Sequence, residues 1–114
     1  MNKIQTLGHG GESRAEEFLK ERGYQVIDRN FHSRFGEIDI IAKDHDTLVF
    51  IEVKARLNNS YGSPEESVTP KKIDKIIKTG QYYCLIHNHQ NLSQRIDVIA
   101  IDGPEIRHLK NVTQ

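Results

Sequence analysis

The segment GEIDIIAKDHDTLVFIEVK, residues 36–54, decides the fold of this chain. Two mostly apolar runs, 37–42 and 47–54, flank a polar group of the kind that closes a β-hairpin. The second run carries no charge before Glu52, which is typical of a strand covered on both faces of its sheet. The segment therefore predicts a hairpin whose second strand is central in a sheet.

The residues before this hairpin predict a helix and a strand. A helix is expected over about 12–22, because Ala15 and Leu19 fall at helical spacing and Gly23 follows as a stop. The next residues, 24–27, alternate as a strand does. These elements precede the hairpin in the predicted order.

The residues after the hairpin predict a second helix and a last strand. Thr69 as N-cap, with Pro70 at the first helical position, marks the helix start. Residues 95–101 predict the strand. The order is αβββαβ, an α/β fold with a mixed sheet flanked by helices. The buried stripe of this second helix is expected to comprise Ile73, Ile76, Ile77, Gly80 and Cys84.

One domain is expected, with loosely held ends. Residues 1–11 hold three glycines and predict a flexible N-terminal segment. The domain itself is expected over 12–102, and residues 103–114 form a C-terminal tail or a small edge element. Tyr61 is expected to anchor a loop, with base stacking as the alternative, and Tyr82 or Tyr83 to pack on the sheet.

Composition excludes several classes of protein. Because 16 Lys and Arg balance 16 Asp and Glu, nucleic-acid binding could arise only from a local basic patch. A single cysteine, Cys84, excludes an internal disulfide and a multi-cysteine zinc site. No apolar run has the length of a membrane helix, and the first residues do not resemble a signal peptide. We therefore expect a cytoplasmic protein with no membrane partner.

Charged residues gather at one end of the predicted hairpin. Glu37 and Asp39 share one face of their strand, and Glu52 and Lys54 share one face of the next, because side chains alternate with period two. If opposing residues have numbers that sum to about 89 or 91, Asp39 lies beside Glu52 or one step from it. Two or three carboxylates and one ammonium group would then lie close together.

This grouping suits a hard divalent cation. Mg²⁺ binds through one or two carboxylates and completes its shell with water and substrate phosphate. Such an ion, with a lysine to orient water, can hydrolyse a phosphodiester. The alternative is that Glu52 and Lys54 form an ordinary solvated pair on a strand. Charges that interrupt apolar strands favour the metal site, since charges are rarely buried without a partner.

The strings GEIDIIA (36–42) and FIEVKAR (50–56) resemble the PD-(D/E)XK nuclease superfamily. Within it the chain is most similar to the small bacterial YraN-like family, itself similar to archaeal Holliday-junction resolvases. The resemblance runs from about Gly8 to Asp102 and implies a restriction-endonuclease-like core over the domain. The first motif departs from the pattern, because Glu-Ile-Asp stands where many members have Pro-Asp.

The resemblance also implies roles for individual residues. Asp39 and Glu52 match the acids that bind Mg²⁺ or Mn²⁺, and Lys54 matches the motif lysine. Glu12 matches a first-helix glutamate that completes the acidic site, although a glutamate there also suits the helix dipole. Glu37 is a further candidate that would support these acids from outside the metal's own ligands.

Basic residues predict where nucleic acid would bind. Arg34 and Arg56 flank the acidic strands and are placed to hold a phosphate. The second helix carries a strip that could follow a phosphate backbone, or could be an ordinary solvated face: Lys71, Lys72, Lys75 and Lys78.

The functional expectation is a metal-dependent endonuclease that hydrolyses phosphodiester bonds in DNA, branched or junction DNA included. The alternative from another class is a non-catalytic nucleic-acid-binding accessory protein with the same fold. A structural partner of another repair or uptake protein is a third. The resemblance to resolvases also suggests a homodimer, since two strands must be cut symmetrically.

Overall fold

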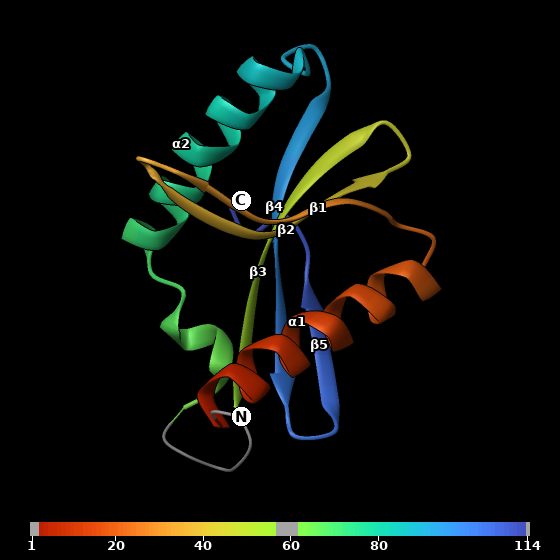
Figure 1. Ribbon diagram of the computed structural model, residues 1–114, viewed down its shortest axis with the longest axis vertical. Coiled ribbons are helices and arrows are strands. Elements are labelled where there is room, and N and C mark those ends of the chain that lie inside the picture. The colour runs from red at the N-terminus through yellow and green to blue at the C-terminus, as the bar shows by residue number, and fades with distance from the viewer. Residues whose placement is uncertain (1–2, 57–61, 114) are drawn as a thin grey trace.

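The fold is a five-stranded mixed sheet with helices packed on it (Figure 1), which confirms the predicted α/β class. The computed structural model describes residues 3–56 and 62–113; Tyr61 lies outside them. None of the helices in these ranges is long and apolar enough to cross a membrane. The elements are α1 (Lys3–Glu21), β1 (Gln25–Ser33), β2 (Gly36–Asp44), β3 (Thr47–Arg56), the short helix η1 (Pro64–Ser67), α2 (Pro70–His87), β4 (Ser93–Asp102) and β5 (Glu105–Leu109).

The strands lie in the order β1-β2-β3-β4-β5, and β3 with β4 is the parallel pair among them. Parallel strands need a long crossover, which α2 supplies here. In the β2–β3 hairpin Ile40 pairs with Ile51 and Ala42 with Val49. The residue numbers of each pair sum to 91, which is one of the two predicted registers. The ladder between β1 and β2 shifts at a bulge between Val26 and Asp28.

Apolar residues cover both faces of β3, as the sequence predicted. Val49 and Ile51 belong to the core that α1 closes, while Leu48 and Phe50 belong to the core that α2 closes. Each of these side chains is almost fully buried. The central strand β3 therefore separates two apolar core layers, one on each face of the sheet.

The start of α1 differs from the prediction. The sequence placed it near Glu12, after a flexible segment, but the helix begins at Lys3 and residues 3–11 are part of it. Gly11 is buried, and a Cβ there would lie 3.3 Å from the Cβ of Ala55. Glycine has a low helix propensity, but at position 11 its lack of a side chain lets the helix backbone lie close to β3.

The stretch after Gly103 also differs from the expected tail. Residues 105–109 form β5, which pairs antiparallel with β4 and extends the sheet. Beyond it the backbone N–H of Val112 donates to the carbonyl of Ile96 at 2.9 Å. The alternative expectation of a small edge element is the one that the structure confirms.

The predicted start of α2 is confirmed, and its buried stripe needs one correction. The Oγ1 of Thr69 accepts from the N–H of Lys72 at 3.2 Å and so caps the helix. Ile77, expected in the stripe, is 37% exposed, whereas Tyr83 is 4% exposed. Ile77 lies one residue beyond the buried Ile76, and that turn of about 100° carries it past the packed face.

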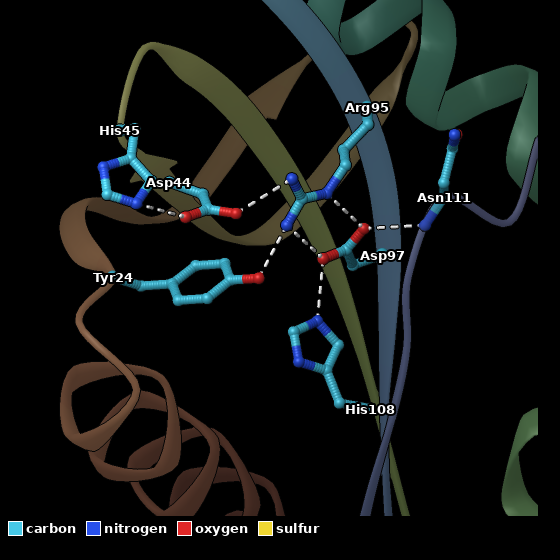
Figure 2. A network of polar contacts seen from close by, with 7 residues as sticks. All are labelled: Tyr24, Asp44, His45, Arg95, Asp97, His108 and Asn111. Atoms are coloured by element: carbon cyan, nitrogen blue, oxygen red, sulfur yellow. Dashed lines mark hydrogen bonds and ion pairs between the residues drawn. The ribbon is translucent and has the colours of Figure 1, made fainter.

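A buried polar network joins β4 to β5 (Figure 2). Asp97, with no exposed surface, accepts from Nε2 of His108 at 2.7 Å and from the N–H of Asn111 at 2.9 Å. Burial alone would raise the pKa of Asp97, but these bonds and the one from Arg95 hold it below its ordinary value. The Arg95 guanidinium also donates to Tyr24 and Asp44. Asp44 in turn lies 3.9 Å from Nε2 of His45.

Candidate functional site

Two carboxyl groups meet where the β2–β3 ladder ends. The last described pair of that ladder is Ile40 with Ile51, and Asp39 and Glu52 occupy the next position on each strand. An oxygen of Asp39, Oδ2, accepts the backbone N–H of Val53 at 2.8 Å. The carboxylate thus satisfies a β3 amide that has lost its strand partner on β2. The expected neighbourhood of Asp39 and Glu52 is present in the structure.

Glu52 is the buried member of the pair, with 5% of its surface exposed. Burial raises its pKa first, and the charge and hydrogen bond of Asp39 raise it further, to about 7. Lys72 and Lys54 act in the opposite direction without cancelling these effects. The charged form of Glu52 is thus less favourable here than in water, and a divalent cation bound by the two acids would stabilise that charged form.

Two ammonium groups approach Glu52 from different elements. Lys54, on β3, places Nζ 4.0 Å from Oε1. Lys72, in the first turn of α2, places Nζ 3.7 Å from Oε2. The sequence expected Lys54 here, but it placed Lys72 on the outer face of the helix as part of a DNA-binding strip. The capped helix start at Thr69 is the signal that fixes Lys72 in that first turn.

The other two predicted acids lie elsewhere. Glu12 pairs with Arg29 at 3.6 Å, on the face of the sheet that α1 covers. Glu37 pairs with His32 across the β1–β2 ladder at 3.2 Å, and both side chains are exposed. Among residues 3–56 and 62–113, no three His, Cys, Asp or Glu side chains form a metal-ligating group. The donor set that the structure assembles is the pair Asp39 and Glu52.

The predicted phosphate-binding arginines have different surroundings. The guanidinium of Arg56 makes two hydrogen bonds to the carboxylate of Asp102, at 3.0 and 2.9 Å, across the β3–β4 ladder. Arg34 is exposed, and its guanidinium carbon lies 4.9 Å from the centre of the Phe35 ring. Arg34 is therefore better placed than Arg56 to meet a ligand from solvent.

The remaining helix lysines face solvent as predicted: Lys71, Lys75 and Lys78. Lys78 forms an ion pair with Asp74 one turn away, at 3.1 Å, in which both side chains are more than half exposed. An exposed pair of this kind contributes little to stability and can exchange its partner for a phosphate. Nucleic-acid binding by this face stays a prediction.

The donor set suits Mg²⁺ or Mn²⁺. Both ions prefer carboxylate oxygens and commonly take only one or two of them from the protein. Asp39 and Glu52 offer such oxygens side by side, and their mutual repulsion is the kind that a divalent cation relieves. The residues present therefore fit the ion that the sequence led us to expect.

The αβββαβ order, extended by β5, is that of the predicted restriction-endonuclease-like α/β fold. The chain belongs to UPF0102, described as an uncharacterised protein family, whose profile matches residues 11–101. This confirms the YraN-like resemblance.

Relatives of the same family cover nearly the whole chain. A UPF0102 protein of Persephonella marina is 48% identical over 104 residues, covering 91% of this chain and 90% of the relative. One from Sulfurihydrogenibium is 45% identical over 111 residues, covering 97% and 96%. One from Clostridium tetani is 46% identical, covering 95% and 93%. The similarity thus extends over the whole domain.

Proposed function

We propose that this protein is a metal-dependent endonuclease that hydrolyses phosphodiester bonds in DNA. The observation that carries the proposal is the pairing of Asp39 with the buried Glu52, with the ammonium groups of Lys54 and Lys72 beside Glu52. Burial and the neighbouring Asp39 raise the pKa of Glu52 to about 7 despite the two lysines, and carboxylates perturbed in this way are common at active sites. Two adjacent carboxylates suit a divalent cation, and the two ammonium groups beside them suit the phosphate that the cation would activate.

Asp39 and Glu52 would hold Mg²⁺ or Mn²⁺. When bound, the ion polarises a phosphoryl oxygen and lowers the pKa of a water molecule. The hydrogen bond from the Val53 N–H to Oδ2 holds the Asp39 carboxylate beside Glu52. Glu12 would join these acids only by giving up its ion pair with Arg29.

The two lysines would act on the phosphate and the attacking water. Lys54 lies on the same strand face as Glu52 and can orient water or stabilise charge on the phosphoryl oxygens. Lys72 approaches the other oxygen of Glu52 and can offset negative charge as a phosphate enters. Among the predicted phosphate-binding residues, Arg34 and the exposed helix lysines would hold the DNA backbone on either side.

A non-catalytic nucleic-acid-binding protein is the second candidate. The exposed cations of α2 favour it, because they could hold a phosphate backbone without any contribution from the acidic pair. In that case DNA binding would be salt-sensitive, and loss of either acid would not weaken it.

The deciding experiment is cleavage of labelled DNA as linear duplex, single strand, flap and four-way junction, with Mg²⁺ or Mn²⁺. We expect the wild type to cut at least one form and Glu52→Gln and Lys54→Ala to be inactive. Glu37→Gln is the matched control, because it removes an exposed carboxylate paired with His32. If the purified wild type cuts nothing, or the Glu52 and Lys54 variants cut as well as it does, the second candidate replaces the first.

A further inference from the structure

A groove with an aromatic wall lies between the β1–β2 hairpin tip and α2. It is lined by residues 32–35 and by Lys78, Gln81, Tyr82 and Leu85, and it encloses about 800 Å³. In Figure 1 the tip of this hairpin, in orange, lies across the helix. Gly36 allows the close approach: its φ is +147°, and a Cβ there would lie 3.4 Å from the Oγ1 of Thr79.

The chemistry of the lining is aromatic and cationic. The rings of Phe35 and Tyr82 lie 6.2 Å apart, and Tyr82 is 38% exposed. Arg34 covers one side of the Phe35 ring, and Lys78 stands on the helix wall. None of the described lining residues is acidic. Ring faces with cations at their edge suit a nucleobase and its phosphate.

Both walls of the groove lead to the acidic pair. Asp39 follows Gly36 by three residues on β2, a distance of ~10 Å along a strand. Lys72 precedes Lys78 by six residues on α2, a distance of ~9 Å along a helix. Stacked nucleotides advance by ~3.4 Å each, so about three of them span the interval. A strand held at Asp39 and Glu52 would reach this groove with its neighbouring nucleotides.

We propose that the groove binds an unpaired nucleotide of the DNA strand whose phosphate lies at the acidic pair. The base would stack against Phe35 and Tyr82, while Arg34 and Lys78 would hold its phosphate. A base in a duplex hides its faces in the stack, so the groove selects DNA with a single-stranded segment beside the cut. The proposal rests on the proposed nuclease function and names its substrate class.

Binding measured without divalent metal tests the groove separately from catalysis. A fluorescein-labelled blunt duplex and the same duplex with a single-stranded extension are titrated in EDTA and followed by anisotropy. We expect the wild type to bind the extended duplex more tightly. In Phe35→Leu/Tyr82→Leu that advantage falls by about 5- to 150-fold, the usual loss for one stacked base, and blunt-duplex affinity stays unchanged. Ile86→Ala is the control, an exposed apolar residue of α2 outside the groove.

A second variant covers the case in which the aromatic variant fails to fold. Lys78→Gln removes an exposed cation that pairs with Asp74, and we expect it to weaken binding of the extended duplex by several-fold. Lys20→Gln is its match, since Lys20 pairs with Glu16 one turn away on α1. Equal losses for both lysine variants would mean that charge alone matters and would overturn the proposal.

The remaining outcomes separate this proposal from the nuclease proposal. If the wild type cuts duplex DNA but shows no preference for the extended form, the groove proposal is wrong and the nuclease proposal stands. If binding depends on the aromatic residues while Mg²⁺ supports no cleavage, the groove stands and the nuclease proposal is wrong. If sedimentation shows a dimer that Tyr82→Leu dissociates, a second copy occupies the groove and the proposal is overturned.

Discussion

Asp39 and Glu52 face each other at the first position where β2 and β3 no longer pair through their backbones. An antiparallel ladder that continued there would satisfy the amide of Val53 with a carbonyl group. In its place a carboxylate accepts that amide, and a second carboxylate is buried beside it. The end of the ladder thus places two carboxyl groups side by side, one of them buried.

Stability should therefore depend on pH through Glu52. The folded protein keeps the Glu52 proton up to about pH 7, whereas the unfolded chain releases it near the ordinary value of 4.5. Since the folded pKa is the higher one, folding stability is lost as pH rises through this window. Glu52→Gln should be more stable than the wild type at about pH 8, on the order of 3 kcal/mol, and similar at about pH 4.

Urea unfolding across this pH range checks the Glu52 prediction. Glu37→Gln is the control, because Glu37 is exposed and its removal should leave the pH profile of the wild type intact. Parallel profiles for the wild type and Glu52→Gln would contradict the burial of a raised-pKa carboxyl at this position.

Two substitutions of Asp39 should distinguish its structural role from its role in metal binding. Asp39→Asn keeps an oxygen that can accept the Val53 N–H, whereas Asp39→Ala leaves that amide without its acceptor and should cost about 1–3 kcal/mol. Both variants should lose the stabilisation that Mn²⁺ gives the wild type, measured as the shift of the thermal midpoint with added ion. An unchanged Mn²⁺ shift in Asp39→Asn would exclude this carboxylate as a ligand.

Gly80 should not tolerate a methyl group. A Cβ at this position would lie 2.6 Å from the ring of Phe50, so Gly80→Ala forces the helix or the ring to move. We expect a loss of about 1–3 kcal/mol from overpacking, despite the better helix propensity of alanine. Chemical denaturation measures it, with Gln81→Ala on the exposed side of α2 as a neutral control. Phe50→Leu in the same chain should recover part of the loss, and additive effects would show that the contact is absent.

Asp97 should matter for stability and not for the acidic site. It has no exposed surface and takes hydrogen bonds from Arg95, His108 and the Asn111 N–H. Asp97→Asn removes the buried carboxylate charge that Arg95 and His108 contact, although Arg95 keeps its ion pair with Asp44, and should cost about 1–3 kcal/mol. Asp46→Asn, in the exposed β2–β3 turn, should change little. A denaturation midpoint as high in Asp97→Asn as in the wild type would contradict this view of the network.

The acids and the lysine of β3 were predictable because strand geometry is local. Period-two alternation and a short turn restrict the hairpin to two registers, and either brings Asp39 near Glu52. Lys72 and Glu12 belong to helices, whose rotation against the sheet depends on packing that a sequence does not display. That rotation turns Lys72 toward Glu52 and Glu12 toward Arg29.

The elements of the fold were predictable where a pattern is strong. The apolar run of β3 and the Thr69–Pro70 start of α2 both have clear local signals. The first turns of α1 do not, since Gly8, Gly10 and Gly11 lower helix propensity and only contact with Ala55 explains the last of them. The strand β5 was also hard to predict, because it is held partly by a contact between distant segments. Its Arg107 forms an ion pair with Glu65 of η1 at 2.8 Å.

The bulge in β1 limits how molecules of this protein can meet. β1 is an edge of the sheet, and an edge normally offers a row of free amides and carbonyls to any other extended chain. The bulge at Val26–Asp28, and Asn30 with its φ of +52°, break that row into short pieces. Strand-to-strand growth of fibrils through this edge is thereby discouraged. A homodimer of the kind that the sequence suggested would then form away from β1, through the β5 edge, the helices or the loops.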